Sequence, residues 1–264
     1  MTMRIAHIVN PVLVPPDSDL GVAQPVTFET MRLARDAAAG RVEVDLLTAQ
    51  YAEDRGAVPA GFRTTPDLER SLLDFGTFAK PRKLPLIADI VDRLHAASDA
   101  DYLVYTNVDI AVLPFFYVAL AAMIDEGHDA LVINRRTISK DYTVVADLPL
   151  MFGQVGSPHG GRDCFVWRRE VTPRFVCGRT VIGQGGIGRV LQINLAATAT
   201  RFREYEDLHL TFHIGDDRTW DRPDQDDIRA FNWAELVKVV DAIRTRGDLP
   251  DHPAVASFLA RRGL

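Results

Sequence analysis

Short apolar runs alternate with stretches of helical periodicity along this chain, and that alternation limits the possible folds more than any other feature of the sequence. Apolar runs of strand length predict buried strands, and the periodic stretches predict helices that cover them. The predicted strands are residues 4–10, 42–48, 102–106 and 130–133, and the predicted helices are residues 26–39, 84–95 and 114–127. Because helices connect successive strands, we expect an α/β fold with a mainly parallel sheet flanked by helices.

The second half of the chain is less regular. Asn232 is followed by Glu235 at the spacing of a capping box, which predicts the start of a last helix. No repeat or linker divides the sequence, so we expect one domain over residues 1–264. The other elements predicted here are strands at 163–168 and 208–214, a helix at 188–197, a short helix at 68–75 within the loop 56–83, and loops at 149–161 and 216–227.

The composition narrows the class of protein. With 264 residues and 47% apolar residues, the chain can bury a continuous core. Its net charge of −6 disfavours nucleic acid or an anionic membrane as the main partner, because both select basic surfaces. No apolar stretch reaches the length of a membrane span, and no signal peptide is evident, so we expect a cytoplasmic protein. Cys164 and Cys177 lack the spacing of a zinc site and are interpreted as reduced packing residues.

The tetrapeptide Thr106-Asn107-Val108-Asp109 follows a buried strand, at the edge of a parallel sheet where ligands bind. On an extended backbone, residues two apart point to the same side, so Asn107 and Asp109 could share one hard cation that bridges two phosphates. The alternative interpretation is an Asx turn that caps the next helix.

At these residues the sequence resembles the GT-A type glycosyltransferases, in which an Asp-x-Asp motif follows a central strand. The resemblance covers residues 4–109 in element order and is closest over 83–110; this chain has Asn107 where the family usually has aspartate. It implies a nucleotide-binding half, residues 1–110, and an acceptor and metal half, residues 111–264. It also implies nucleotide-sugar contacts from Asn10, Pro11, Thr48, Gln50, Arg82, Lys83, Thr106, Asn107 and Asp109.

The stretch 209–218 contains His209, Thr211 and His213 on one face of a predicted strand. In many GT-A enzymes a late histidine completes the metal site, and the resemblance implies that His213 joins Asp109, with Asn107 assisting, around Mn²⁺ or Mg²⁺. The alternative is that His213 is a hydrogen-bonded structural residue.

The stretch 159–169 resembles the glycine-led strand beneath the family's acceptor site. Asp163 is therefore predicted to contact a sugar hydroxyl or act as a base, with Asn134 and Arg135 approaching the same cleft; the alternative is that Asp163 caps a turn. The function that follows is transfer of a sugar from a nucleoside diphosphate sugar to an unknown small-molecule or glycan acceptor.

Other functions remain open from the sequence. A nucleotidyltransferase could use the same fold and metal site, and the replacement at Asn107 leaves room for a binding module without catalysis. Gly183, Gly185 and Gly188 form a G-x-G-x-x-G pattern before a predicted helix, which would suit an NAD-dependent oxidoreductase if a strand preceded it.

Overall fold

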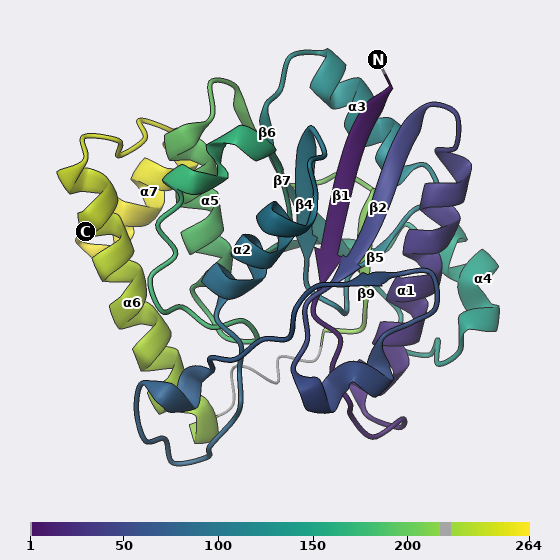
Figure 1. The fold of residues 1–264 in the computed structure, drawn as a ribbon, viewed down its shortest axis with the longest axis horizontal. Coiled ribbons are helices and arrows are strands. Elements are labelled where there is room, and N and C mark those ends of the chain that lie inside the picture. The colour runs from purple at the N-terminus through teal and green to yellow at the C-terminus, as the bar shows by residue number, and fades with distance from the viewer. Residues whose placement is uncertain (1, 217–222) are drawn as a thin grey trace.

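Strands that are apolar on both faces form the middle of the sheet in the computed structural model, which describes residues 2–216 and 223–264. β1 (Met3–Val9) lies parallel to β2 (Val42–Thr48) on one side and to β4 (Tyr102–Thr106) on the other (Figure 1). All five residues of β4 are buried. The carboxyl ends of these strands therefore meet at one edge of the sheet.

The sheet is mixed but mostly parallel, with the order β3-β2-β1-β4-β7-β6-β9-β5 and β8 paired to β6. β7 runs antiparallel between β4 and β6, whereas β6 is parallel to β8 and β9. The predicted fold class is thus confirmed, with β7 antiparallel at the centre and β5 antiparallel to β9 at the edge. The remaining strands are β3 (Arg63–Thr64), β5 (Ala111–Val112), β6 (Ala130–Ile138), β7 (Ser157–Arg168), β8 (Phe202–Tyr205) and β9 (Thr211–Ile214).

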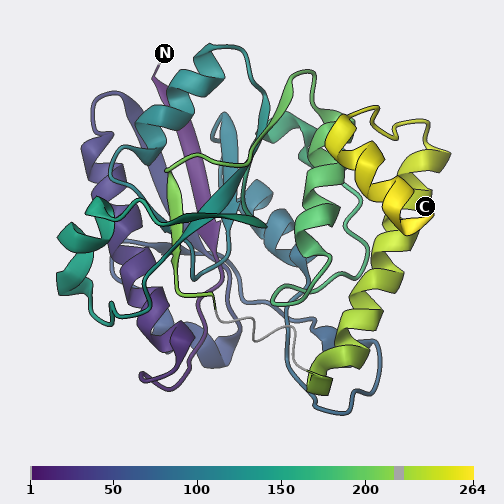
Figure 2. The same cartoon turned by 180° about the vertical axis from the view of Figure 1, so that it is seen from behind.

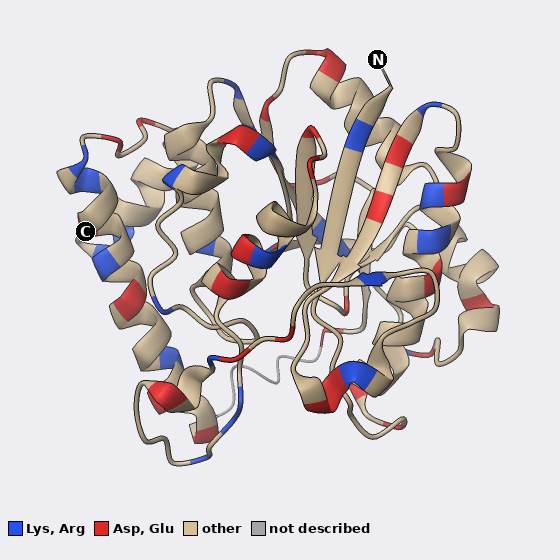
Figure 3. Cartoon of the chain, in the orientation of Figure 1, with Lys and Arg blue, Asp and Glu red and all other residues tan. Residues whose placement is uncertain are grey.

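Helices cover both faces of the sheet, as the two opposite views in Figures 1 and 2 show. α1 (Asp19–Ala37) and α3 (Phe116–Asp125) bury their apolar residues against one face. The other face is covered by α2 (Ile87–Ala97), α5 (Ile187–Thr198), α6 (Asp226–Thr245) and α7 (Pro253–Arg262). Charged side chains lie mostly on helices and loops (Figure 3), so the layers are held together by apolar contacts.

Two elements near the N-terminus differ from the prediction. α1 begins at Asp19 rather than at residue 26, because Ser18 caps it and Pro25 is accommodated within it. Pro25 lacks the N–H that would bond the carbonyl of Gly21, and the missing side chain of Gly21 lets the helix approach Pro15, whose carbonyl oxygen would lie 2.2 Å from an added Cβ. The predicted short helix at 68–75 is only a 3₁₀ turn, Leu72–Asp74.

The predicted loop at 149–161 is also wrong, because it contains most of α4 (Leu148–Gly153) and the first half of β7. The loop predicted at 216–227 contains the 3₁₀ turn Pro223–Gln225 and the first residues of α6; residues 217–222 lie outside the described part of the chain.

Asn232 does not start a helix but lies buried in the middle of α6. Its carboxamide accepts a hydrogen bond from the N–H of Val181 (2.9 Å) and donates to the carbonyls of Val181 (2.9 Å) and Gly185 (3.2 Å). Glu235 accepts from the N–H of Arg179 at 3.0 Å. The two polar residues that imitate a capping box therefore bind an irregular segment 177–186, whose backbone would otherwise lack partners.

The same segment excludes the dinucleotide-binding interpretation. Val181 forms only an isolated bridge with Leu86, and no strand leads directly into Gly183: the preceding strand, β7, ends at Arg168. The Rossmann fingerprint requires a strand, a glycine turn and a helix in direct succession. Gly183 and Gly186 have φ of 73° and 100°, so these glycines serve a tight turn before α5.

Both cysteines are buried and free, and burial raises the pKa of each thiol, as expected for packing residues. None of the helices in the described ranges is long and apolar enough to cross a membrane.

Candidate active site

The carboxyl ends of β1 and β2 carry four of the predicted nucleotide contacts. Asn10 donates a hydrogen bond from Nδ2 to the carbonyl of Ala49 (2.5 Å), and Pro11 beside it is buried. Thr48 Oγ1 and Gln50 Oε1 are buried and have no hydrogen-bond partner among the described residues. Buried acceptors without a donor are costly, and a ligand with polar groups would satisfy them.

The buried side chain of His7 holds the end of β4 in place. Its Nδ1 is hydrogen bonded to the hydroxyl of Tyr117, and its Nε2 is hydrogen bonded to Oγ1 of Thr106, both at 2.9 Å. Burial lowers the pKa of His7 to about 3, so the imidazole is neutral. Thr106 is thus anchored to β1 and α3, which fixes the point from which the next loop departs.

Residues 107–110 form a turn, closed by a hydrogen bond from the N–H of Ile110 to the carbonyl of Asn107 (3.1 Å). The expectation that Asn107 and Asp109 point to the same side is therefore wrong, because it assumed an extended backbone. Asn107 is directed to Asp163, whereas Asp109 is directed to His213.

Asp109 and His213 come together as predicted, with Oδ2 and Nε2 3.3 Å apart. His213 Nδ1 lies 2.7 Å from the carbonyl of Gly215, which can only accept, so this nitrogen carries a proton and Nε2 faces Asp109. Asp109 Oδ1 is buried without a hydrogen-bond partner among the described residues. One carboxylate oxygen of Asp109 thus lies against Nε2 of His213, and the other has no partner among the described residues.

The two groups shift each other's pKa. Burial opposes ionisation of Asp109, but its hydrogen bond to His213, the charge of His213 and the charge of Arg135 outweigh burial and lower the pKa of the carboxyl group. Burial likewise opposes protonation of His213, and the hydrogen bond and charge of Asp109 outweigh it and raise the pKa of the imidazole.

Asp163 lies at a bulge in the pairing of β7 with β6. Ile133 pairs with Cys164 and Asn134 pairs with Arg162, so Asp163 is the extra residue between them. The pairing of β7 with β4 stays regular at this residue, because the N–H of Asn107 points to the carbonyl of Asp163 at 3.4 Å. On the side of β6, one carboxylate oxygen of Asp163 accepts a hydrogen bond from Nη1 of Arg135 at 2.8 Å.

The pair of Asp163 and Arg135 continues toward the end of β9. Arg135 Nη2 lies 3.5 Å from Asp216 Oδ1, and His159 Nε2 lies 3.4 Å from the same oxygen. Only 12% of the Arg135 side chain and 11% of the Asp163 side chain are exposed, so solvent screens this ion pair weakly. His159 and Asp216 belong to the stretches 159–169 and 209–218 considered from the sequence, but their contact was not predicted, because nothing local indicates that these two stretches meet.

Asn134 lies beside the bulge and is 2% exposed. Its Oδ1 is buried and has no hydrogen-bond partner among the described residues. Next to it, Arg162 forms an ion pair of 2.7 Å with Glu204, whose side chain is 4% exposed. The sequence did not indicate this second pair, because Glu204 lies on β8, a strand that was not predicted.

The contacts of Arg82 and Lys83 lie away from the Asp109–His213 pair. Arg82 Nη1 donates to Gln225 Oε1 (2.8 Å), just before α6, and burial lowers the pKa of its guanidinium. Lys83 pairs with Glu53, and its Nζ lies 4.0 Å from the centre of the Tyr51 ring. Lys83 is therefore next to the segment that follows β2, where it can approach a ligand held by Thr48 and Gln50.

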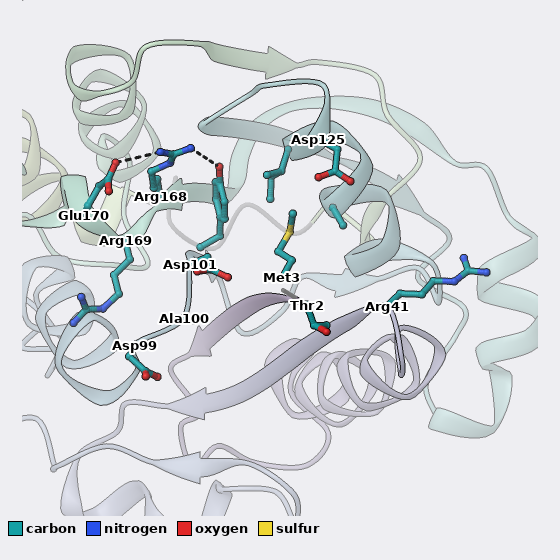
Figure 4. A pocket seen from close by; sticks show the side chains of 13 residues that line it. Thr2, Met3, Arg41, Asp99, Ala100, Asp101, Asp125, Arg168, Arg169 and Glu170 are labelled. Atoms are coloured by element: carbon teal, nitrogen blue, oxygen red, sulfur yellow. Dashed lines mark hydrogen bonds and ion pairs between the residues drawn. The ribbon is translucent and has the colours of Figure 1, made fainter.

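A depression of about 690 Å³ lies at the opposite edge of the sheet, among Thr2, Asp101 and Arg168 (Figure 4). Arg168 there contacts the Tyr102 hydroxyl (3.5 Å) and Glu170 (3.4 Å). This edge carries the amino ends of β1 and β4. Because open α/β sheets bind ligands at the carboxyl ends of their strands, the edge with Asp109 is the candidate site.

No group of three or more histidine, cysteine, aspartate or glutamate side chains within residues 2–216 and 223–264 is arranged to hold a metal ion. A cation at Asp109 and His213 would need further ligands from a substrate or from water. Mg²⁺ in phosphate-binding sites is commonly held this way, by one or two carboxylates and the phosphates themselves.

No protein-family model matches the sequence, and a search of curated proteins finds no match either. Solved structures do resemble the fold. The crystal structure of S. aureus TarS residues 1–349 with UDP-GlcNAc matches with a TM-score of 0.51 and 10% identity, over 90% of this chain and 67% of that chain. Glucosyl-3-phosphoglycerate synthase of Mycobacterium tuberculosis, in complex with Mn²⁺, UDP and phosphoglyceric acid, matches with a TM-score of 0.49 and 16% identity, over 94% and 80%. The likeness to TarS concerns the fold alone, which is the GT-A type α/β fold expected from the sequence.

Proposed function

We propose that this chain is a glycosyltransferase that takes a sugar from a nucleoside diphosphate sugar. The observation that carries the proposal is the pairing of Asp109 and His213 at the carboxyl edge of the sheet, with Asp109 Oδ1 buried and unsatisfied among the described residues. The TarS structure, which has the same fold, contains UDP-GlcNAc. A uridine diphosphate sugar is therefore the first donor to test.

The residues present fit a divalent cation. Asp109 supplies a carboxylate oxygen, and His213 supplies Nε2, because its Nδ1 proton is held by the carbonyl of Gly215. A histidine that donates its other N–H to a carbonyl is the usual arrangement of an imidazole ligand. Bound Mn²⁺ or Mg²⁺ would stabilise the negative charge of the departing diphosphate.

The positions of the other predicted nucleotide-sugar contacts suggest which part of the donor each would bind. Thr48 and Gln50, with their unsatisfied oxygens, and Asn10 and Pro11 beside them would bind the nucleoside. Lys83 would approach the diphosphate, since it already lies over Tyr51 after β2; Arg82 is the weaker candidate, because its guanidinium is turned to Gln225.

The acceptor side is proposed to lie along β6 and β7. Asn134 Oδ1 has no donor among the described residues, so it can accept a hydrogen bond from an acceptor hydroxyl. Both oxygens of Asp163 are already hydrogen bonded, one to Arg135 and one to Asn107. We therefore assign Asp163 to holding Arg135 in the site, and the role of base that the resemblance suggested is not retained.

The experiment is a thermal-shift screen of nucleoside diphosphates and nucleoside diphosphate sugars, with and without Mn²⁺, followed by an assay of donor hydrolysis and transfer. A ligand that binds only the folded state raises the melting temperature. Asp109→Asn should abolish the Mn²⁺-dependent part of the shift and lower turnover by about 10²–10³, the effect of removing one electrostatic stabiliser of a transition state.

The matched control is Asp125→Asn, an exposed carboxylate on α3 at the opposite edge. It should leave donor binding and turnover unchanged. A screen in which no nucleotide stabilises the wild-type protein, or in which Asp109→Asn behaves like Asp125→Asn, would show that the donor site is assigned wrongly.

A further inference from the structure

The side chain of Asn107 is held from two directions. Its Nδ2 donates to Asp163 Oδ1 at 3.0 Å, and its Oδ1 accepts from the hydroxyl of Tyr105 at 2.9 Å. The orientation of the carboxamide follows from these partners, since a carboxylate can only accept a hydrogen bond. The backbone N–H of Asn107 also points to the carbonyl of Asp163, at 3.4 Å, which continues the ladder between β4 and β7.

An aspartate could not make these contacts. At position 107 it would place two carboxylates face to face at hydrogen-bond distance, with no proton between them. Like charges in a part-buried site repel strongly, because water screens them poorly. With Asp163 opposite, position 107 needs a side chain that donates a hydrogen bond. Asparagine meets this requirement, whereas the aspartate of the Asp-x-Asp motif does not.

Asp163 connects Asn107 to Arg135, because its carboxylate is hydrogen bonded to both side chains. Its second oxygen accepts from Arg135 Nη1 at 2.8 Å, and Arg135 Nη2 lies 3.5 Å from Asp216. Asp216 directly follows Gly215, whose carbonyl holds the Nδ1 proton of His213. The chain of contacts from Asn107 therefore ends next to the Asp109–His213 pair.

We infer that Asn107 is a positioning residue, which acts through Asp163 to hold the Arg135 guanidinium beside Asp109 and His213, and that Asn107 is not a ligand of the cation. This inference rests on the proposed function, which makes this region the active site. The contacts of Asp163 with Asn107 and Arg135 can nevertheless be tested without an assay of turnover. It replaces the role in metal binding that the resemblance gave to Asn107.

The test compares the wild type with Asn107→Asp and with the double variant Asn107→Asp/Asp163→Asn, in which one carboxylate and one amide face each other in exchanged order. Asn107→Asp should lower the melting temperature by roughly 2–4 °C and slow transfer by about tenfold or more. The double variant should regain at least half of both losses. Mn²⁺ affinity, measured with UDP by calorimetry, should stay within about threefold in Asn107→Asp.

A ligand role for Asn107 requires the opposite result. An added carboxylate on the cation should then tighten Mn²⁺ binding by about tenfold or more, and Asp163→Asn should give no recovery; either result would overturn the inference. Tyr105→Phe provides a milder variant if Asn107→Asp does not fold. It removes only the hydroxyl that orients the carboxamide and should slow transfer without changing Mn²⁺ affinity; unchanged transfer contradicts the inference.

Failure of the proposed function gives a different pattern. If the wild type neither binds a nucleotide nor turns one over, the proposed function is wrong. The recovery of melting temperature in the double variant still tests the contact between Asn107 and Asp163, because that readout needs no substrate.

Discussion

Stability should depend on pH through His7, a neutral histidine at the centre of the fold. Its imidazole is fully buried between the hydroxyls of Tyr117 and Thr106, and no carboxylate from residues 2–216 or 223–264 contacts it. Burial alone lowers its pKa to about 3, against 6.5 for an exposed histidine. In the pH range between these values, the unfolded chain binds a proton at His7 that the folded protein does not.

The sign follows from linkage. A base whose pKa is lowered on folding contributes its full stability above pH 6.5 and loses it as pH falls, because protons favour the unfolded chain. Each pH unit below 6.5 costs about 1.4 kcal/mol until the folded pKa is reached. Between about pH 7.5 and pH 5, His7 should therefore lower the free energy of unfolding by about 2 kcal/mol, a large part of the 5–15 kcal/mol that a typical domain has.

The assay is urea unfolding of the wild type and His7→Gln at about pH 7.5 and pH 5. Glutamine keeps a hydrogen-bond donor and an acceptor but differs from histidine in shape, so the variant is less stable than the wild type. Because glutamine never becomes charged, this loss does not depend on pH. Carboxylates and other histidines contribute equally to the two proteins and cancel in the comparison. The advantage of the wild type over His7→Gln should shrink by about 2 kcal/mol at the lower pH. An advantage that stays constant within about 0.5 kcal/mol would show that His7 does not stay neutral on folding.

Three further predictions concern the site and its support. Mn²⁺ binding should strengthen from pH 6 to pH 8 and level off above the ordinary histidine pKa, because Asp109 raises the pKa of His213 and the metal needs the deprotonated Nε2; calorimetry in the presence of UDP would measure this. Asn232→Ala should lower the free energy of unfolding by about 2–4 kcal/mol, since it leaves three backbone groups without partners, whereas Val237→Ala on the exposed side of α6 should cost less than about 0.5 kcal/mol. NAD⁺ should not raise the melting temperature, because the turn at Gly183 follows no strand, and a shift would reopen the oxidoreductase interpretation.

The sequence predicted the elements whose periodicity is a direct result of burial. The ranges 42–48 and 102–106 match β2 and β4 to the residue, since both strands are apolar where they pack between helix layers. β8 was missed because none of its four residues is fully buried, so it has no apolar run. The start of α1 was missed: Ser18 caps the helix, which begins at Asp19, and Pro25 lies inside it.

The location of the site was predictable and its internal contacts were not. Asp109 and His213 could be expected at one edge because each follows or ends an apolar strand, and strands of one sheet bring such ends together. The partner of Asn107 is instead Asp163, 56 residues away in sequence, and the antiparallel pairing of β4 with β7 that places the two residues opposite each other is not revealed by any pattern of apolar residues.

The pairing of β4 with β7 also explains why one motif can keep its place while it changes its chemistry. Tyr105 pairs with Phe165 in this antiparallel register, and the hydrogen bond from the N–H of Asn107 to the carbonyl of Asp163 continues it, so Asp163 lies opposite Asn107. The carboxylate of Asp163 accepts from Asn107 on this side and from Arg135 of β6 on the other. Once Asp163 is there, the facing position needs a hydrogen-bond donor, and asparagine supplies one at the same size as aspartate. Asp109, beyond the turn, faces His213 instead and remains free of this constraint, so a carboxylate is retained where the cation is proposed to bind.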